Sequence, residues 1–245
     1  MPAPLRAAVA QPPCAPHDVA ANAWAHAAAV RRAGARVVVF PELSLTGYEL
    51  DAAPVDPADP RLAPLTEACA ETGTIALAGA PVAEGQATYI AVLALDGAKV
   101  TVAYRKMWLG DEEAARFSPG PGPAKITVDG WRLGLAVCKD TGVPRHAAGT
   151  AALGIDAYLA GTVKHAEEAA LQHERARRIA VGYRLWVAVA SFAGPTGGGY
   201  DETAGRSGIW APDGALITGT GSGSGEATSA TFDKSNMEGL VPESR

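Results

Sequence analysis

Three polar residues with complementary chemistry each follow an apolar, strand-like segment. Glu42 ends "VVVFPE", Lys106 ends "VAYRK", and Cys138 directly follows "LGLAV". A carboxylate can accept the proton of a thiol, and the resulting thiolate can attack a carbonyl or nitrile carbon. An ammonium stabilises both the thiolate and the negative charge that develops on the attacked group. If these three side chains meet in the fold, they predict a cysteine-dependent hydrolase.

Each of the three residues also has an ordinary structural explanation. Cys138 could be a small buried apolar side chain, Glu42 a helix cap or loop charge, and Lys106 a solvated strand end. Histidines offer a second route, a Cys–His hydrolase. The pattern around all five favours solvated or core positions, and none has metal-ligand spacing: His17, His26, His146, His165 and His173.

The segments that would position these groups alternate between two patterns. Short β-branched apolar runs that end in polar loops predict strands buried on both faces. These runs are Arg36–Glu42, Leu133–Asp140, Asp156–Thr162 and Leu185–Ser191. Ala-rich stretches predict helices at His17–Ala35, where Gly34 is the expected stop, and at Lys164–Arg184. This alternation favours helices layered on sheet.

Two further segments have an Asp-Gly pair between strand-like runs, which is a strong hairpin signal. They are Ala87–Lys106 and Ser207–Gly219. Hairpins among parallel-type strands predict mixed sheets. The Gly/Ser-rich stretch Gly219–Ser229 is expected to be a flexible connection to a final short strand.

Composition restricts the class of protein. The 245 residues are 48% hydrophobic and 19% charged, and no linker or repeat divides them, so we expect one domain over residues 1–245. A net charge of -5 gives no electrostatic case for binding nucleic acid or an anionic membrane. The sequence has neither the pattern of a secretory signal nor a long apolar span, which predicts a cytoplasmic protein. The three cysteines, Cys14, Cys69 and Cys138, are expected to be free thiols.

The order and wording of the three polar segments resemble a known family. Val37–Tyr48, Tyr104–Gly120 and Leu133–Asp140 resemble the Glu, Lys and Cys signatures of the nitrilase superfamily, the carbon–nitrogen hydrolases. The resemblance begins at Ala7–Gln11 and includes Gly194–Gly214, so it extends over nearly the whole chain.

The resemblance implies an α/β fold, a four-layer α-β-β-α sandwich with two mixed β-sheets. It implies that Glu42 is the general base, Lys106 the cation beside the oxyanion, and Cys138 the nucleophile. The backbone N–H of Lys139 would be a second oxyanion donor. No cofactor or metal is implied, and the substrate would be a small molecule, most simply an amide.

The family also has a second glutamate, four residues before the aromatic of an F-x-P-G element. Counting back from Phe117 gives Glu113, which would orient Lys106 or bind the substrate nitrogen, and Glu112 is the competing choice. Tyr48 is a candidate for the pocket wall, although core packing explains it equally well.

The chain departs from the family pattern around the triad. The unusual positions are Ile90, Trp108, Lys139, Val143–Arg145 and Val181-Gly182. These departures leave the substrate open among amides, N-carbamoyl amines and nitriles, in that order, with an amidase-like branch favoured. The charge of Lys139 either stays solvated or favours a carboxylate-bearing substrate. The resemblance also implies a homodimer. A catalytically idle binding or scaffold protein is the alternative from another class.

Overall fold

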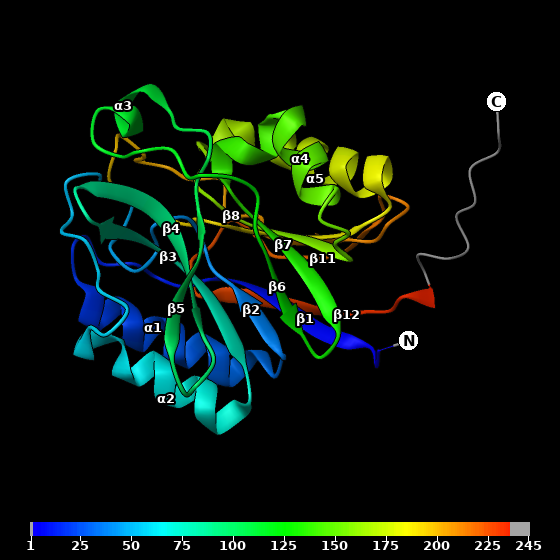
Figure 1. Ribbon diagram of the computed structural model, residues 1–245, viewed down its shortest axis with the longest axis horizontal. Helices are drawn as coiled ribbons and strands as arrows, with labels where there is room; N and C mark the ends of the chain where they lie inside the picture. The colour runs from blue at the N-terminus through cyan, green and yellow to red at the C-terminus, as the bar shows by residue number, and fades with distance from the viewer. Residues whose placement is uncertain (1, 236–245) are drawn as a thin grey trace.

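Two six-stranded sheets lie face to face between two outer layers of helices (Figure 1). The computed structural model describes residues 2–235. Helices α1 and α2 cover the outer face of one sheet, and α4 and α5 cover the outer face of the other. The predicted four-layer α-β-β-α sandwich is therefore confirmed.

The first sheet has the strand order β12-β1-β2-β3-β4-β5. Strands β1, β2 and β3 run parallel to one another, whereas β12, β4 and β5 pair antiparallel with their neighbours. The strand bounds are β1 Leu5–Gln11, β2 Val37–Val39, β3 Ile75–Glu84, β4 Ala87–Leu95, β5 Val100–Arg105 and β12 Glu226–Phe232.

The second sheet has the order β11-β10-β9-β8-β7-β6, with β7, β8 and β9 parallel and the outer pairs antiparallel. The strand bounds are β6 Lys125–Val128, β7 Trp131–Val137, β8 Ala157–Thr162, β9 Trp186–Ser191, β10 Gly208–Trp210 and β11 Leu216–Gly219. Both sheets are mixed, as the two Asp-Gly hairpins predicted.

Helix α1 begins and ends at residues with identifiable capping roles. The side chain of Asp18 accepts a hydrogen bond from the N–H of Ala21 at the start of α1, and Gly34 ends that helix with φ 53°. The bounds of the α-helices are α1 Val19–Ala33, α2 Ala63–Thr72, α3 Asp111–Ala114, α4 Pro144–Ala151 and α5 Ala169–Tyr183. Three 3-10 turns are Pro60–Leu62 (η1), Cys138–Gly142 (η2) and Ala166–Glu168 (η3).

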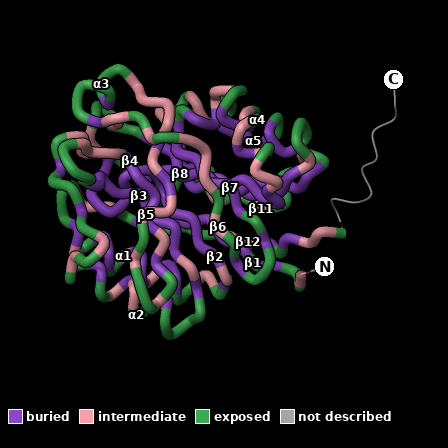
Figure 2. Tube along the Cα trace, viewed as in Figure 1, coloured by how far each residue is buried: buried purple, intermediate pink, exposed green. Residues whose placement is uncertain are grey.

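The buried apolar residues form three clusters that correspond to the interfaces of the sandwich. Figure 2 shows buried residues concentrated along the strands of the two sheets. The central layer, between the sheets, holds large side chains such as Leu77, Trp131 and Phe232. The layer beneath α1 and α2 is rich in alanine, which lets helices lie close to the sheet. Burial of apolar area at these interfaces is the main force that holds the layers together.

Two predicted segments differ from the structure. The strand expected over Arg36–Glu42 is shortened to β2, because the chain leaves the sheet around Pro41, which has no N–H to donate. The stretch Gly219–Ser229 is not a connection throughout: from Glu226 it forms β12, which pairs with β1 over seven residues. Long-range pairing overrides the weak local preference of a Gly/Ser-rich sequence.

The α-helices of the described residues are at most 15 residues long. None of those within residues 2–235 is long and apolar enough to cross a membrane.

Candidate active site

Glu42 lies in a turn that is enclosed between the two sheets. Two glycines permit this close approach, Gly79 on β3 and Gly161 on β8. A Cβ at Gly161 would lie 2.5 Å from the carbonyl oxygen of Phe40, and one at Gly79 would overlap the backbone nitrogen of Leu43. Leu43 itself has a φ of 49°, which a non-glycine residue adopts at a cost of about 1 kcal/mol. The carboxylate is thus held rigidly, and 1% of Glu42 is exposed.

The Gly161→Ala variant tests how tightly this turn is held. The added methyl group would push the backbone before Glu42, so we expect a loss of roughly 10²-fold in kcat, together with a lower Tm. Hydrolysis assays and thermal unfolding measure both effects. Gly122→Ala is the control, since nothing lies within 4 Å of a Cβ at that position. Equal kcat values for Gly161→Ala and the parent would contradict the rigid placement.

Cys138 is the first residue of the 3-10 turn η2, at the sharp bend that directly follows β7. Its φ of 41° is in the left-handed region, which is uncommon for a residue with a side chain and is often found at functional sites. The thiol donates a hydrogen bond to the carbonyl oxygen of Val163 at 3.1 Å. The bend therefore presents the sulfur at the end of the strand, with the backbone of Lys139 following directly.

Lys106 follows β5 and is 1% exposed. Its ammonium donates to Oε1 of Glu42 at 2.6 Å and to both carboxylate oxygens of Glu113 at 2.7 Å. One cation thus lies between two carboxylates. All three of its N–H groups are directed at carboxylate oxygens in this state of the protein.

The two candidates for the second glutamate have different surroundings. Glu113 is buried, and its carboxylate also accepts hydrogen bonds from the hydroxyl of Tyr48 and the N–H of Gly110. Glu112 is exposed. The structure therefore brings together Glu42, Lys106 and Glu113 and turns the competing candidate toward solvent.

Near neutral pH, the electrostatics of the centre favour a protonated thiol beside a carboxyl group whose pKa is close to the pH. Burial raises the pKa of Glu42 to about 7, and the positive charge of Lys106 opposes this rise. Burial, and then the charge of Glu42, raises the pKa of Cys138 to about 12. The pKa of Glu113 is lowered, since Lys106 and its hydrogen bonds outweigh desolvation. The other carboxylate oxygen of Glu42, Oε2, has no hydrogen-bond partner within residues 2–235.

A cavity of about 420 Å³ adjoins this centre. Its lining residues are Tyr48, Gly110, Asp111, Glu112, Glu113, Lys139, His165, Gly198 and Tyr200. Both predicted pocket residues are in this set. Tyr48 packs edge-to-face on Tyr200, at 5.2 Å between ring centres. The ammonium of Lys139 donates to the carbonyl oxygen of Leu109 at 2.6 Å, so its charge is partly satisfied at the rim.

Sequence reasoning missed two aromatic side chains of this cavity. His165 stacks on Tyr200 at 4.2 Å between ring centres, and both lie on the cavity wall. His165 was expected to be a solvated or core residue of a helix, but it precedes the turn η3, so helical periodicity does not apply to it. Tyr200 ends the Gly-rich run "GPTGGGY", whose loop conformation has no periodic signal.

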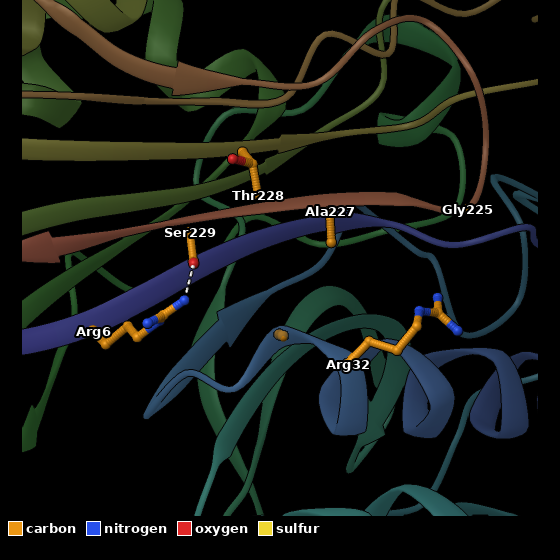
Figure 3. Close-up of a pocket in the computed structure, with 7 residues that line it drawn as sticks. Arg6, Arg32, Gly225, Ala227, Thr228 and Ser229 are labelled. Atoms are coloured by element: carbon orange, nitrogen blue, oxygen red, sulfur yellow. Dashed lines mark hydrogen bonds between the residues drawn. The ribbon is translucent and has the colours of Figure 1, made fainter.

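A second cavity, of about 320 Å³, lies apart from this centre, near β12, the start of β1 and the end of α1 (Figure 3). Arg6 donates a hydrogen bond to the hydroxyl of Ser229 there, at 3.0 Å. None of the predicted site residues lines it. The predicted site residues Tyr48, Glu113 and Lys139 instead line the cavity of about 420 Å³.

The chain matches a known protein family and a curated relative. Residues 6–240 match the family described as Carbon-nitrogen hydrolase. The chain is 31% identical over 230 residues to "Hydrolase in pqqF 5'region" from Pseudomonas protegens, a match that covers 87% of this chain and 78% of the relative.

Solved structures with the same fold include two members of the nitrilase superfamily. The NitN amidase of Nesterenkonia sp. AN1 is 25% identical, with a TM-score of 0.82 over 95% of this chain and 94% of the amidase. Nit3 of Saccharomyces cerevisiae is 23% identical, with a TM-score of 0.85 over 96% of this chain and 92% of Nit3. At that identity, Nit3 supports the fold alone.

Proposed function

Because the chain belongs to the carbon–nitrogen hydrolase family, we propose that it hydrolyses small amides by acyl transfer through Cys138. The observation that carries this proposal is the ammonium of Lys106 bound between the carboxylates of Glu42 and Glu113, at the bend that presents the thiol. The family match establishes a carbon–nitrogen hydrolase. The amide as substrate and the roles of individual residues are the proposal.

In the first step, Glu42 takes the thiol proton as the sulfur of Cys138 attacks the amide carbon. Since the thiol pKa is about 12 and that of Glu42 is about 7, a free thiolate is scarce at neutral pH, and proton transfer accompanies the attack. The negative charge that develops on the substrate oxygen needs nearby donors. Lys106 and the backbone N–H of Lys139 have this role in the proposal.

Proton transfer to Glu42 also changes the bonding of Lys106. In the free protein, the three N–H groups of Lys106 are directed at carboxylate oxygens. A protonated Glu42 is neutral and attracts the ammonium less strongly. One N–H of Lys106 can then turn to the oxyanion, while Glu113 continues to hold the ammonium in place. The carboxylate pair thus couples thiol activation to oxyanion stabilisation.

The tetrahedral intermediate then breaks its C–N bond. Protonated Glu42 returns its proton to the nitrogen, ammonia or an amine leaves, and the acyl group stays on Cys138 as a thioester. Glu42 next removes a proton from water, which attacks the thioester and releases the carboxylic acid and the thiol. Glu42 accepts and returns each proton that moves in these steps, so the proposed cycle needs no cofactor.

Amides rank first among the substrates because the chain resembles an amidase over nearly its whole length. Structures of that amidase hold acrylamide or butyramide. We therefore expect ammonia release from a panel that begins with acetamide, propionamide and butyramide, with N-carbamoyl amines and nitriles as the other arms. A single active arm identifies the class of the scissile group.

An idle binding protein remains the alternative from another class. It predicts no turnover in any arm of the panel and slow alkylation of Cys138 by iodoacetamide. The buried charge cluster argues against it, since two carboxylates around one ammonium are costly to bury without a use. The homodimer expected from the family resemblance also stays a proposal, and size-exclusion chromatography with light scattering tests it.

The pH dependence follows from the base. Glu42 acts only when it is deprotonated, and its pKa is raised to about 7, so kcat/KM should rise through about pH 7 and level off above pH 8. Below pH 6 the rate should fall about tenfold per pH unit. Steady-state rates from pH 5 to 9 measure this. A profile that is flat from pH 5 to 9 would exclude Glu42 as the titrating base.

A further inference from the structure

A buried carboxylate joins the two sheets directly beside the proposed catalytic centre. Asp140, two residues after Cys138, accepts a hydrogen bond from the N–H of Val137 at 2.9 Å through Oδ2. Its other oxygen, Oδ1, accepts one from the N–H of Trp108 at 3.0 Å. Val137 ends β7 in one sheet, and Trp108 follows Lys106 beyond the end of β5 in the other. One side chain therefore ties the nucleophile segment to the lysine segment.

Asp140 is itself held by a chain of buried side chains. The hydroxyl of Tyr104 lies 2.8 Å from Oδ2 of Asp140 and 2.8 Å from Nε2 of His146. On the other side of the imidazole, Nδ1 of His146 lies 2.9 Å from the hydroxyl of Tyr158 on β8. Each of these four residues is at most 1% exposed. Water is thus excluded as a competitor for these bonds.

The direction of each hydrogen bond in this chain can be assigned. The carboxylate of Asp140 only accepts, so the hydroxyl of Tyr104 donates to it. The oxygen of Tyr104 then accepts from Nε2–H of His146, which leaves Nδ1 to accept from the hydroxyl of Tyr158. Burial lowers the pKa of His146, consistent with the neutral ring that this assignment requires. Burial raises the pKa of Asp140, and the nearby His146 and then the hydrogen bonds donated by Tyr104 and Val137 oppose that rise.

We propose that His146 is a positioning residue that acts through Tyr104 and Asp140 to hold Cys138 at a fixed separation from Lys106. The two groups belong to different sheets, so their separation depends on contacts between the sheets rather than on one continuous backbone. Neither His146 nor Asp140 touches the substrate in this scheme. The inference deepens the proposed function and rests on its assignment of Cys138 as the nucleophile.

The test compares His146→Ala with His146→Gln, whose amide can restore an N–H donor to Tyr104. One readout is the rate of alkylation of Cys138 by iodoacetamide, and the other is kcat and KM for butyramide or the best amide of the panel. We expect His146→Ala to lower the alkylation rate and kcat about tenfold with KM within twofold, and His146→Gln to recover to within about threefold of the parent.

A purely structural role is separated by a destabilised control. Leu65→Ala removes a buried side chain beneath α1 and α2, far from the network, and should lower Tm without slowing alkylation. A His146→Ala protein with a lower Tm and the alkylation rate of the parent would overturn the proposal. Should His146→Ala fail to fold, Tyr104→Phe decides, because it keeps the ring and removes only the hydroxyl.

The same data distinguish the inference from the function on which it rests. Slower alkylation in His146→Ala, with no amide hydrolysed by the parent, would support the positioning network and refute the amidase proposal. Amide hydrolysis with equal kcat and equal alkylation rates in parent, His146→Ala and Tyr104→Phe would refute the network and leave the amidase proposal standing.

Discussion

Replacing Cys138 with alanine is expected to reduce amide hydrolysis by about 10⁴-fold or more. The thioester forms on this sulfur. Without the thiol, the proposed mechanism has no nucleophile that can form the acyl intermediate. The fold should survive, since alanine is smaller than cysteine and the loss is confined to one hydrogen bond, to the carbonyl oxygen of Val163. Ammonia release and thermal unfolding measure the two effects separately.

The matched control is Cys69→Ala, a second free and buried cysteine, located in α2. That variant should keep the kcat of the parent while losing some stability. A second buried cysteine thus separates the effect of removing a thiol from the effect of removing the nucleophile. Undiminished ammonia release by Cys138→Ala would rule out covalent catalysis at this position.

The Glu42→Gln variant should lower kcat by about 10³-fold, the second-largest effect that we expect. Glutamine preserves the size of the side chain but cannot take the thiol proton, and Cys138, with a pKa of about 12, stays protonated at neutral pH. Alkylation of Cys138 by iodoacetamide at pH 7 should slow as well. The step near pH 7 in the profile of kcat/KM should disappear.

Glu67→Gln is the control for charge, because Glu67 is exposed on α2 and far from the cavity. It changes the net charge of the protein by the same amount and should leave all three readouts unchanged. Should Glu42→Gln alkylate as fast as the parent and keep the pH step, another group must be the base.

The layers of the fold are predictable from the sequence, whereas the pairing of the edge strand β12 is less so. Alternating apolar strands and Ala-rich helices are local patterns, and the helix end at Gly34 follows from its freedom to adopt a positive φ. By contrast, the Gly/Ser-rich pattern predicts a flexible connection that extends into the first residues of β12. Its seven pairs with β1 join residues more than two hundred positions apart, and no local preference of a Gly/Ser-rich sequence specifies such a partner.

The candidate centre shows the same division. The sequence by itself determined which chemical groups are available at strand ends, a carboxylate at Glu42, an ammonium at Lys106 and a thiol at Cys138, and in what order they occur. Counting back from Phe117 favours Glu113 but leaves Glu112 as a competing choice, because one residue of register in a short loop is invisible to periodicity. Burial of Glu113 against Lys106, with Glu112 exposed, supports Glu113.

Only the tertiary structure decided what surrounds these groups. His165 and Tyr200 lie on the cavity wall because separate loops converge there, and the side chain of Asp140 bonds to backbone from both sheets. The physical reason is the range of the interactions. Side-chain patterning reflects contacts within one element, whereas the separations between Cys138 and its partners depend on how two whole sheets pack against each other.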